Sequence, residues 1–300
     1  AQKIGCTASQ KVFAVWSNYM DMDTGDFCEI HDAIKNGTAL ADYPNLSPSE
    51  SWFLHLANGD RISGTDGAMT VYRPNPANAG VREYFKQRVV RESIRVYGGI
   101  YQPDGVFLDN VEMSWGKLLE KCAGTPSPCP REYPDALSLK QYRLDVKGLV
   151  AAVKSGVPAG KVLWANLAEH SGYENLNWSE YLSILDGAMD KRFALGSAGQ
   201  PVGGDIRSKI DRLKSWSQAG KTVIAAAQGK SDKSYYDYAL GLFLLAADGV
   251  TAEFNYNNNA QYQEYYDDPK LAWNLGLPSG SYTSTDLNHE SYSRSYACGS

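Results

Sequence analysis

The sequence predicts an α/β fold in which eight parallel strands alternate with helices and close into a single (β/α)8 TIM barrel. Apolar, strand-like runs alternate with helix-like segments along the whole chain, as expected for a parallel sheet covered by helices. Three of these runs begin with Asp-Gly and end on an acid, at Asp109, Asp190 and Glu253. Strands buried on both faces are nearly continuous apolar runs. A charge at the end of such a run is costly unless it faces a cleft.

The first part of the chain predicts three strands and two helices. Its first strand is the apolar run KVFAVWSNY, and its weak second strand ends at Pro44. Asn58-Gly59 turns the chain after the third strand into an inserted hairpin that returns through residues 68–72. Asn36-Gly37 stops the first helix, and apolar residues at helical spacing mark the second. The expected strands are 11–19, 38–43 and 52–57, and the expected helices are 27–35 and 79–97.

The rest of the chain continues the same alternation through five more strands. Segment 206–216 carries apolar residues at i, i+4, i+7 and i+10, and 235–247 is apolar nearly all round, which predicts a deeply packed helix. The expected strands are 106–109, 161–166, 185–190, 222–227 and 250–253, and the expected helices are 137–155, 178–184, 206–216 and 235–247. No linker or composition shift divides the sequence. We therefore expect one domain, residues 1–300, with the C-terminal tail packing on the barrel.

The acids at the strand ends predict a catalytic site. They end the fourth, sixth and eighth strands, and even-numbered strands of such a barrel supply one layer of side chains. Glycoside cleavage needs one carboxylic acid to protonate the leaving oxygen and one carboxylate to attack the anomeric carbon or activate water. Each acid also has a structural interpretation. Asp109 would cap a helix or hold a loop, Asp190 would pair with Lys191 or Arg192, and Glu253 would form a salt bridge at the barrel rim.

Composition narrows the classes of partner. The chain has 20 Tyr and 7 Trp against 8 Phe, and aromatic rings with a polar handle suit half-wet surfaces on which sugars stack, although many Tyr simply cover surface. The net charge of −5 argues against a nucleic-acid partner. No apolar run reaches the roughly 18 residues of a membrane span. The sequence contains no Gly-x-Ser-x-Gly nucleophile elbow, which argues against an esterase or peptidase.

The cysteines and the start of the chain indicate a processed, secreted protein. Ala1 stands first, with no Met and no apolar signal segment. Two disulfides are expected: a loop staple between Cys122 and Cys129, and a link near the termini between Cys6 and Cys298, which leaves Cys28 over. Five cysteines with two bridges can pair in fifteen ways, and five reduced thiols are the alternative.

Several segments resemble one family. The run 103–111 (PDGVFLDNV) is similar to bacterial glycoside hydrolases grouped near the endo-alpha-1,4-polygalactosaminidases. The segments FLHLANG at 53–59, YRPNP at 72–76, ANL at 165–167, LDGAM at 185–189 and LGLP at 275–278 follow in the family's order. The resemblance implies a barrel and a hydrolase acting on a polysaccharide. Such families tend to carry Glu where this chain has Asp190, and the cations Lys191 and Arg192 beside it would favour the ionised carboxylate.

The sequence thus predicts a secreted glycoside hydrolase with a polysaccharide or oligosaccharide substrate. We expect no cofactor and no metal, because the four His are scattered and no Cys-x-x-Cys occurs. A non-catalytic, glycan-binding barrel is the alternative. His55 and Trp16 also have structural interpretations, and Asn110 would equally bond its own loop. The polar and aromatic residues expected to contact substrate lie at strand ends or at the mouth: Trp16, Tyr19, Asp42, His55, Tyr72, Asn110, Asn166 and Gln228.

Overall fold

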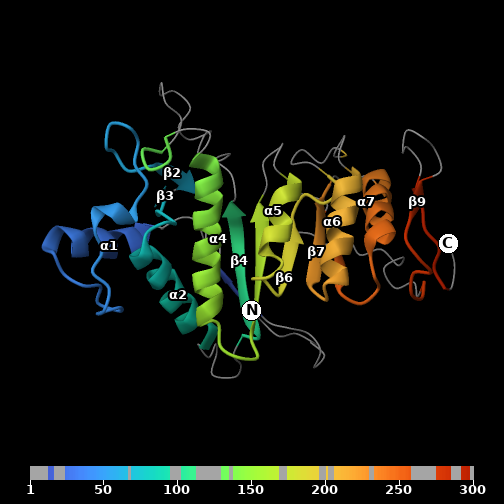
Figure 1. The fold of residues 1–300 in the computed structure, drawn as a ribbon, viewed down its shortest axis with the longest axis horizontal. Helices are drawn as coiled ribbons and strands as arrows, with labels where there is room; N and C mark the ends of the chain where they lie inside the picture. Colours follow the sequence, from blue (N-terminus) through green and yellow to red (C-terminus); the bar gives the residue numbers. More distant parts are fainter. Residues whose placement is uncertain are drawn as a thin grey trace. The chain divides into compact units, whose positions relative to one another are not determined.

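The computed structural model describes two compact units, Ala1–Leu185 and Asp186–Ser300 (Figure 1). The described residues are 13–16, 24–66, 69–94, 103–112, 130–134, 138–168, 174–195, 201, 206–229, 233–257, 275–284 and 292–297. Both units are built from parallel strands alternating with helices. The predicted α/β class is therefore confirmed, while closure into a barrel stays a prediction.

The sheet of the first unit is parallel, in the order β1-β4-β5. Its strands are β1 (Phe13–Trp16), β4 (Gly105–Glu112) and β5 (Val162–Ala168). Its helices are α1 (Thr24–Asn36), α2 (Ala79–Ile94), α4 (Ser138–Gly156) and α5 (Glu174–Tyr181). Helices α2 and α4 pack side by side (Figure 1). The predicted apolar stripe of α2 is buried at Val81, Tyr84, Phe85 and Val89.

The predicted second and third strands are wrong. Residues 38–49 form turns, in which Leu40 and Leu46 are joined by a backbone hydrogen bond of 3.0 Å. A 3₁₀ turn, η1 (Glu50–Trp52), then leads into an extended segment. There Leu54 N–H donates to Arg73 and Leu54 C=O accepts from Ile62. The backbone groups that a sheet strand would offer are thus already paired within the insert.

Two antiparallel pairings organise that insert. The turn at Asn58-Gly59 returns the chain, because Gly59 adopts φ 90°, and an antiparallel bridge joins His55 to Arg61. Beyond it, β2 (Ser63–Asp66) pairs with β3 (Met69–Tyr72) in an antiparallel hairpin. The reversal follows from the turn residues that the sequence shows, while the long strand expected before them is replaced by single bridges.

The main strands of the second unit are parallel, in the order β6-β7-β8. The strands are β6 (Gly187–Asp190), β7 (Thr222–Gln228) and β8 (Ala252–Asn257), and the helices are α6 (Ile206–Gln218) and α7 (Lys233–Ala246), which contact each other (Figure 1). The tail adds the antiparallel pair β9 (Thr283–Ser284) and β10 (Tyr292–Ser293).

The tail is fixed to the end of α7 by Arg294. Its Nη1 lies 2.6 Å from the carbonyl of Ala247 and 3.0 Å from that of Leu245. A cation at a helix C-terminus satisfies the last carbonyls and complements the helix dipole. Among the helices in the described segments, none is both long and apolar enough to cross a membrane.

Candidate active site

The candidate site of the first unit is a β-bulge between β4 and β5. The register pairs Leu108 with Ala165, and then Val111 with Leu167. Two residues of β4, Asp109 and Asn110, therefore face the single residue Asn166 of β5. Bulges of this kind redirect side chains and are common beside active sites and at barrel rims.

Asp109 and Asn166 meet at this bulge. The Asn166 Nδ2 donates a hydrogen bond of 2.7 Å to Asp109 Oδ1. Asn166 is 1% exposed, whereas Asp109 is partly exposed. A carboxylate oxygen only accepts hydrogen bonds, so this contact fixes which way the Asn166 amide faces. At the bulge, the buried Asn166 amide thus orients the partly exposed carboxylate of Asp109.

The other end of the Asn166 amide is unusual. Its Oδ1 is buried and has no hydrogen-bond partner among the residues that the structure describes. Leaving a buried acceptor without a partner costs about 1–3 kcal/mol. Such exceptions are rare in folded proteins and call for an explanation. A hydroxyl donor on a ligand would satisfy this oxygen.

Asp190 ends β6, as the sequence predicts, but its surroundings differ from the prediction. It is 8% exposed, and its Oδ2 lies 3.3 Å from Lys209 Nζ and 3.5 Å from Arg212 Nη2. Burial raises the pKa of Asp190, but these two cations and a backbone hydrogen bond from Arg192 outweigh it, so the pKa is lowered. The expected charged partners, Lys191 and Arg192, are thus replaced by two residues of α6.

Glu253 does not end its strand. β8 begins at Ala252 and runs to Asn257, so Glu253 is the second residue of the strand, and it is exposed. The shift has a local cause: Asp248 Oδ1 accepts the N–H groups of Val250, Thr251 and Ala252 in a turn. The backbone can enter the ladder only after that turn. The predicted position of Glu253 at a buried strand end is therefore wrong.

His55 is a buried residue that contacts two more exposed carboxylates. It is 2% exposed, its Nδ1 lies 2.7 Å from Glu132 Oε1, and its Nε2 lies 3.2 Å from Glu50 Oε1. Glu50 also pairs with Arg61 through two contacts of 2.6 Å. The hydrogen bond from Arg61, joined by that from His55 and opposed by burial, lowers the pKa of Glu50 to about 2. Both ring nitrogens face carboxylates, which fits the structural interpretation of this histidine.

The remaining predicted substrate contacts are dispersed. Asp42 lies in an exposed turn and therefore does not end a strand, contrary to the prediction. Its carboxylate pairs with Arg91 at 2.6 Å. Tyr72 ends β3 with its ring edge-on to Phe53. Gln228 ends β7, and its Nε2 is buried with no hydrogen-bond partner among the described residues.

Other predicted residues fall wholly or partly outside the described residues. Trp16 ends β1 and Asn110 sits in the bulge, but only their backbones are described. The residues outside the described ranges are Tyr19, Cys6, Cys122, Cys129 and Cys298. Cys28 is an exposed, free thiol on α1. Within the described segments, no three His, Cys, Asp or Glu side chains are grouped as metal ligands would be.

Four charged residues of these networks were not anticipated: Lys209, Arg212, Glu50 and Glu132. Lys209 and Arg212 each precede a residue of the predicted stripe of α6, Ile210 and Leu213, so they border its buried face. The position of these two cations next to the apolar stripe could have indicated, from the sequence, that they lie near a buried acid. The pairing of His55 with Glu132, 77 residues away, has no counterpart in local spacing.

Comparison with known proteins adds a family and a distant structural likeness. A family model described as hypothetical glycosyl hydrolase family 15 matches residues 17–300. Among solved structures, the chain is similar to a GH31 family sulfoquinovosidase from E. rectale in complex with an aza-sugar inhibitor, with 15% sequence identity and a TM-score of 0.42. The match covers 74% of this chain and 31% of that chain. No match was found among curated proteins.

Proposed function

Because the chain belongs to the hypothetical glycosyl hydrolase family 15, we propose that it hydrolyses O-glycosidic bonds in a polysaccharide, with Asp109 as one of two catalytic carboxylates. The observation that carries this proposal is the bulge, where Asn166 holds the partly exposed carboxylate of Asp109 at 2.7 Å. Glycoside cleavage requires such a carboxylate beside the sugar ring. Asn166 Oδ1, which has no hydrogen-bond partner among the described residues, would offer an acceptor to a sugar hydroxyl that reaches it.

The arrangement suits Asp109 for attack on the anomeric carbon or for activation of a water. Asn166 is a positioning residue, since it touches the carboxylate and holds its direction. Asp190 is poorly suited to donate a proton, because Lys209 and Arg212 hold it as an anion. We therefore look for the proton donor among the other acids of the parallel strands, Glu112 at the end of β4 and Glu253 in β8.

Three further parts of the proposal concern the fold, the location of the protein and its disulfides. We propose that the strands close into a (β/α)8 barrel and that the protein is secreted, with disulfides Cys122–Cys129 and Cys6–Cys298. Mass spectrometry of the intact and reduced protein tests both links. A mass unchanged on reduction would contradict them.

The first test replaces the central carboxylate. Asp109→Asn keeps the size of the side chain and should lower the release of reducing ends from a panel of polysaccharides by about 100- to 10,000-fold. The circular dichroism spectrum and the affinity for the polysaccharide should stay unchanged. Asp237→Asn is the matched control, because Asp237 is an exposed acid of α7, away from the bulge, that pairs with Lys233 at 2.9 Å.

The same assay separates the roles. Asn166→Ala should reduce turnover less than Asp109→Asn and change its pH profile, because it releases the carboxylate without removing it. Glu112→Gln and Glu253→Gln then identify the proton donor by their loss of turnover. Wild-type release of reducing ends that survives in Asp109→Asn would refute the assignment of that residue.

A second candidate function is a glycan-binding protein without catalysis. The ion pairs of Asp190 favour it, since they leave one predicted catalytic acid bound to Lys209 and Arg212. The two functions differ in one result. Binding to a polysaccharide with no product from the wild-type protein would support the binding protein and exclude the hydrolase.

A further inference from the structure

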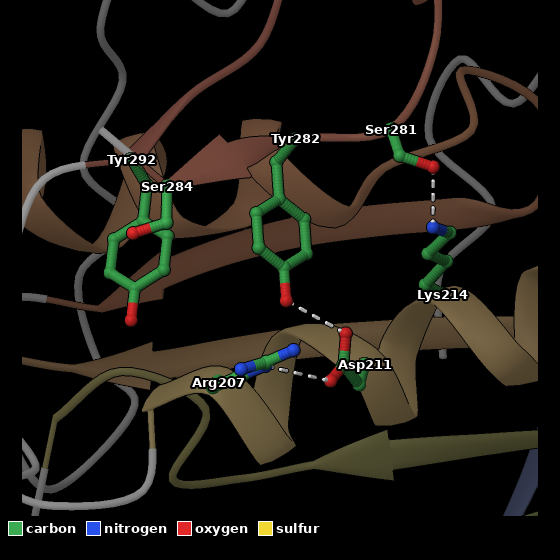
Figure 2. Close-up of a pocket in the computed structure, with 7 residues that line it drawn as sticks. All are labelled: Arg207, Asp211, Lys214, Ser281, Tyr282, Ser284 and Tyr292. Atoms are coloured by element: carbon green, nitrogen blue, oxygen red, sulfur yellow. Dashed lines mark hydrogen bonds and ion pairs between the residues drawn. The ribbon is translucent and has the colours of Figure 1, made fainter. Parts of the chain in front are cut away.

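A polar and aromatic pocket lies on the second unit, between α6 and the C-terminal tail (Figure 2). Its volume is about 300 Å³, which is at the small end of ligand-binding pockets. Its lining residues come from α6 and from the segments that carry β9 and β10, and none comes from β6, β7 or β8. The pocket is therefore separate from the strand ends of this unit, where Asp190 and Gln228 lie.

The polar side chains of this pocket are held in place by one another. The Tyr282 hydroxyl donates to Asp211 Oδ1 at 2.9 Å, and Arg207 Nε lies 3.7 Å from Asp211 Oδ2. Lys214 Nζ donates to Ser281 Oγ at 2.7 Å. Figure 2 shows these contacts joining the tail to one face of α6. Side chains fixed before binding lower the entropy that a ligand must overcome.

Two tyrosines give the pocket an aromatic wall. The Tyr282 and Tyr292 rings meet edge to face, with centroids 5.7 Å apart and an interplanar angle of 67°. Both hydroxyls point toward α6 (Figure 2). Tyr292 thus offers a ring surface and a polar group to a ligand.

The chemistry of the lining selects the class of ligand. Two cations, Arg207 and Lys214, stand beside one acid, Asp211, and Arg207 is 61% exposed, so donors and acceptors are both within reach. Sugar hydroxyls both donate and accept, and the faces of sugar rings are apolar enough to lie on aromatic rings. We propose that this pocket is a non-catalytic carbohydrate-binding site that takes one or two neutral sugar units of a glycan chain.

This inference rests on the proposed function only for the identity of the glycan. A polysaccharide held at a second site raises its effective concentration at the first, so affinity for long chains increases without any new catalytic contact. Short substrates that cannot reach both sites would gain nothing. The pocket should therefore affect the binding of polymers and leave turnover of a short oligosaccharide unchanged.

The test is affinity electrophoresis in gels containing soluble starch, xylan, dextran or hydroxyethyl cellulose, with Asp109→Asn as the background so that the polymer stays intact. Tyr292→Ala should raise the Kd for the retaining polymer about tenfold, the loss expected for one aromatic contact. Tyr292→Phe keeps the ring and should give a smaller loss. Tyr235→Ala is the matched control, because Tyr235 is a partly exposed tyrosine of α7 that does not line the pocket.

The outcomes separate this site from the catalytic one. Retention that weakens in Tyr292→Ala and Tyr292→Phe but not in Tyr235→Ala supports the site, even if the wild type releases no reducing ends. No retention of any variant by any of the four polymers, or equal retention of all variants, would overturn it. In that case, hydrolysis by the wild type would still support the proposed function. Should Tyr292→Ala misfold, Tyr292→Phe alone decides.

Discussion

At the scale of single residues, Asp190 shows how a strand-end acid is stabilised in the interior. It is one negative charge beside two buried cations, Lys209 and Arg212, which are 6% and 7% exposed. Taking ions out of water is costly, and their mutual attraction repays the cost only when each has a partner. The carboxylate therefore stabilises α6 against β6, and its loss would remove the negative charge that both buried cations face.

Asp190→Asn should therefore destabilise the protein more than an ordinary charge removal. Breaking a buried ion pair by removing one partner costs about 3–5 kcal/mol, whereas an exposed pair is worth about 0–1 kcal/mol. Urea unfolding at neutral pH measures the loss, with Asp237→Asn as the exposed control. Similar free energies of unfolding for both variants would contradict a structural role for Asp190.

The candidate site was predictable where it depends on strand position and not where it depends on distant pairing. Asp109 and Asn166 were predicted to end the strands 106–109 and 161–166, and they meet at 2.7 Å. Because β4 runs on to Glu112 and β5 to Ala168, both residues lie inside their strands and not at the ends. The bulge that joins them was not foreseen, because it is a mismatch of register between two strands, visible only once both are paired. Glu253 was misplaced, because the turn formed by Asp248 delays the start of β8.

At the scale of elements, the strands that alternate with long helices were predicted and those of the insert were not. Apolar runs followed by strong helical periodicity gave β1 and β4 to β8. The run at 52–57 is equally apolar, yet its backbone groups pair with Arg73 and Ile62 inside the insert. A short apolar run does not by itself show which segment its backbone pairs with. Here the turn at Asn58-Gly59 brings the following residues back, so the run pairs with them and not with the parallel sheet.

Two glycines of the second unit test how closely its elements pack. A Cβ at Gly229, directly after β7, would meet the buried Tyr256 ring at 2.6 Å from Cζ and Leu195 at 2.9 Å from Cδ1, whereas a Cβ at Gly241 in α7 would meet nothing within 4 Å. Gly229→Ala should cost about 1–3 kcal/mol through overpacking. Gly241→Ala should add about 0.5–1 kcal/mol by favouring the helix. The midpoints of urea unfolding measure both changes in stability. If both variants were stabilised or both were destabilised, this description of the packing would be contradicted.

At the scale of the whole molecule, carboxylates with lowered pKa values link stability to pH. They are Glu50 at about 2, together with Glu83, Asp190 and Asp248, which are lowered as well. In the unfolded chain these groups bind protons at a higher pH than in the folded one. Stability from them is therefore complete above the unfolded pKa and is lost as the pH falls through the folded pKa.

Glu50 allows this link to be measured at one place, because its ion pair with Arg61 has two contacts of 2.6 Å. A double-mutant cycle of Glu50→Gln and Arg61→Gln isolates their coupling free energy from other effects. The coupling should be present at about pH 6 and should shrink as the pH falls from about 4.5 toward 2, the range between the ordinary pKa of Glu50 and its folded value. Urea unfolding of the four proteins at each pH gives the coupling. A value that is constant across this range would mean that the pair with Arg61 does not hold Glu50 ionised in the folded protein.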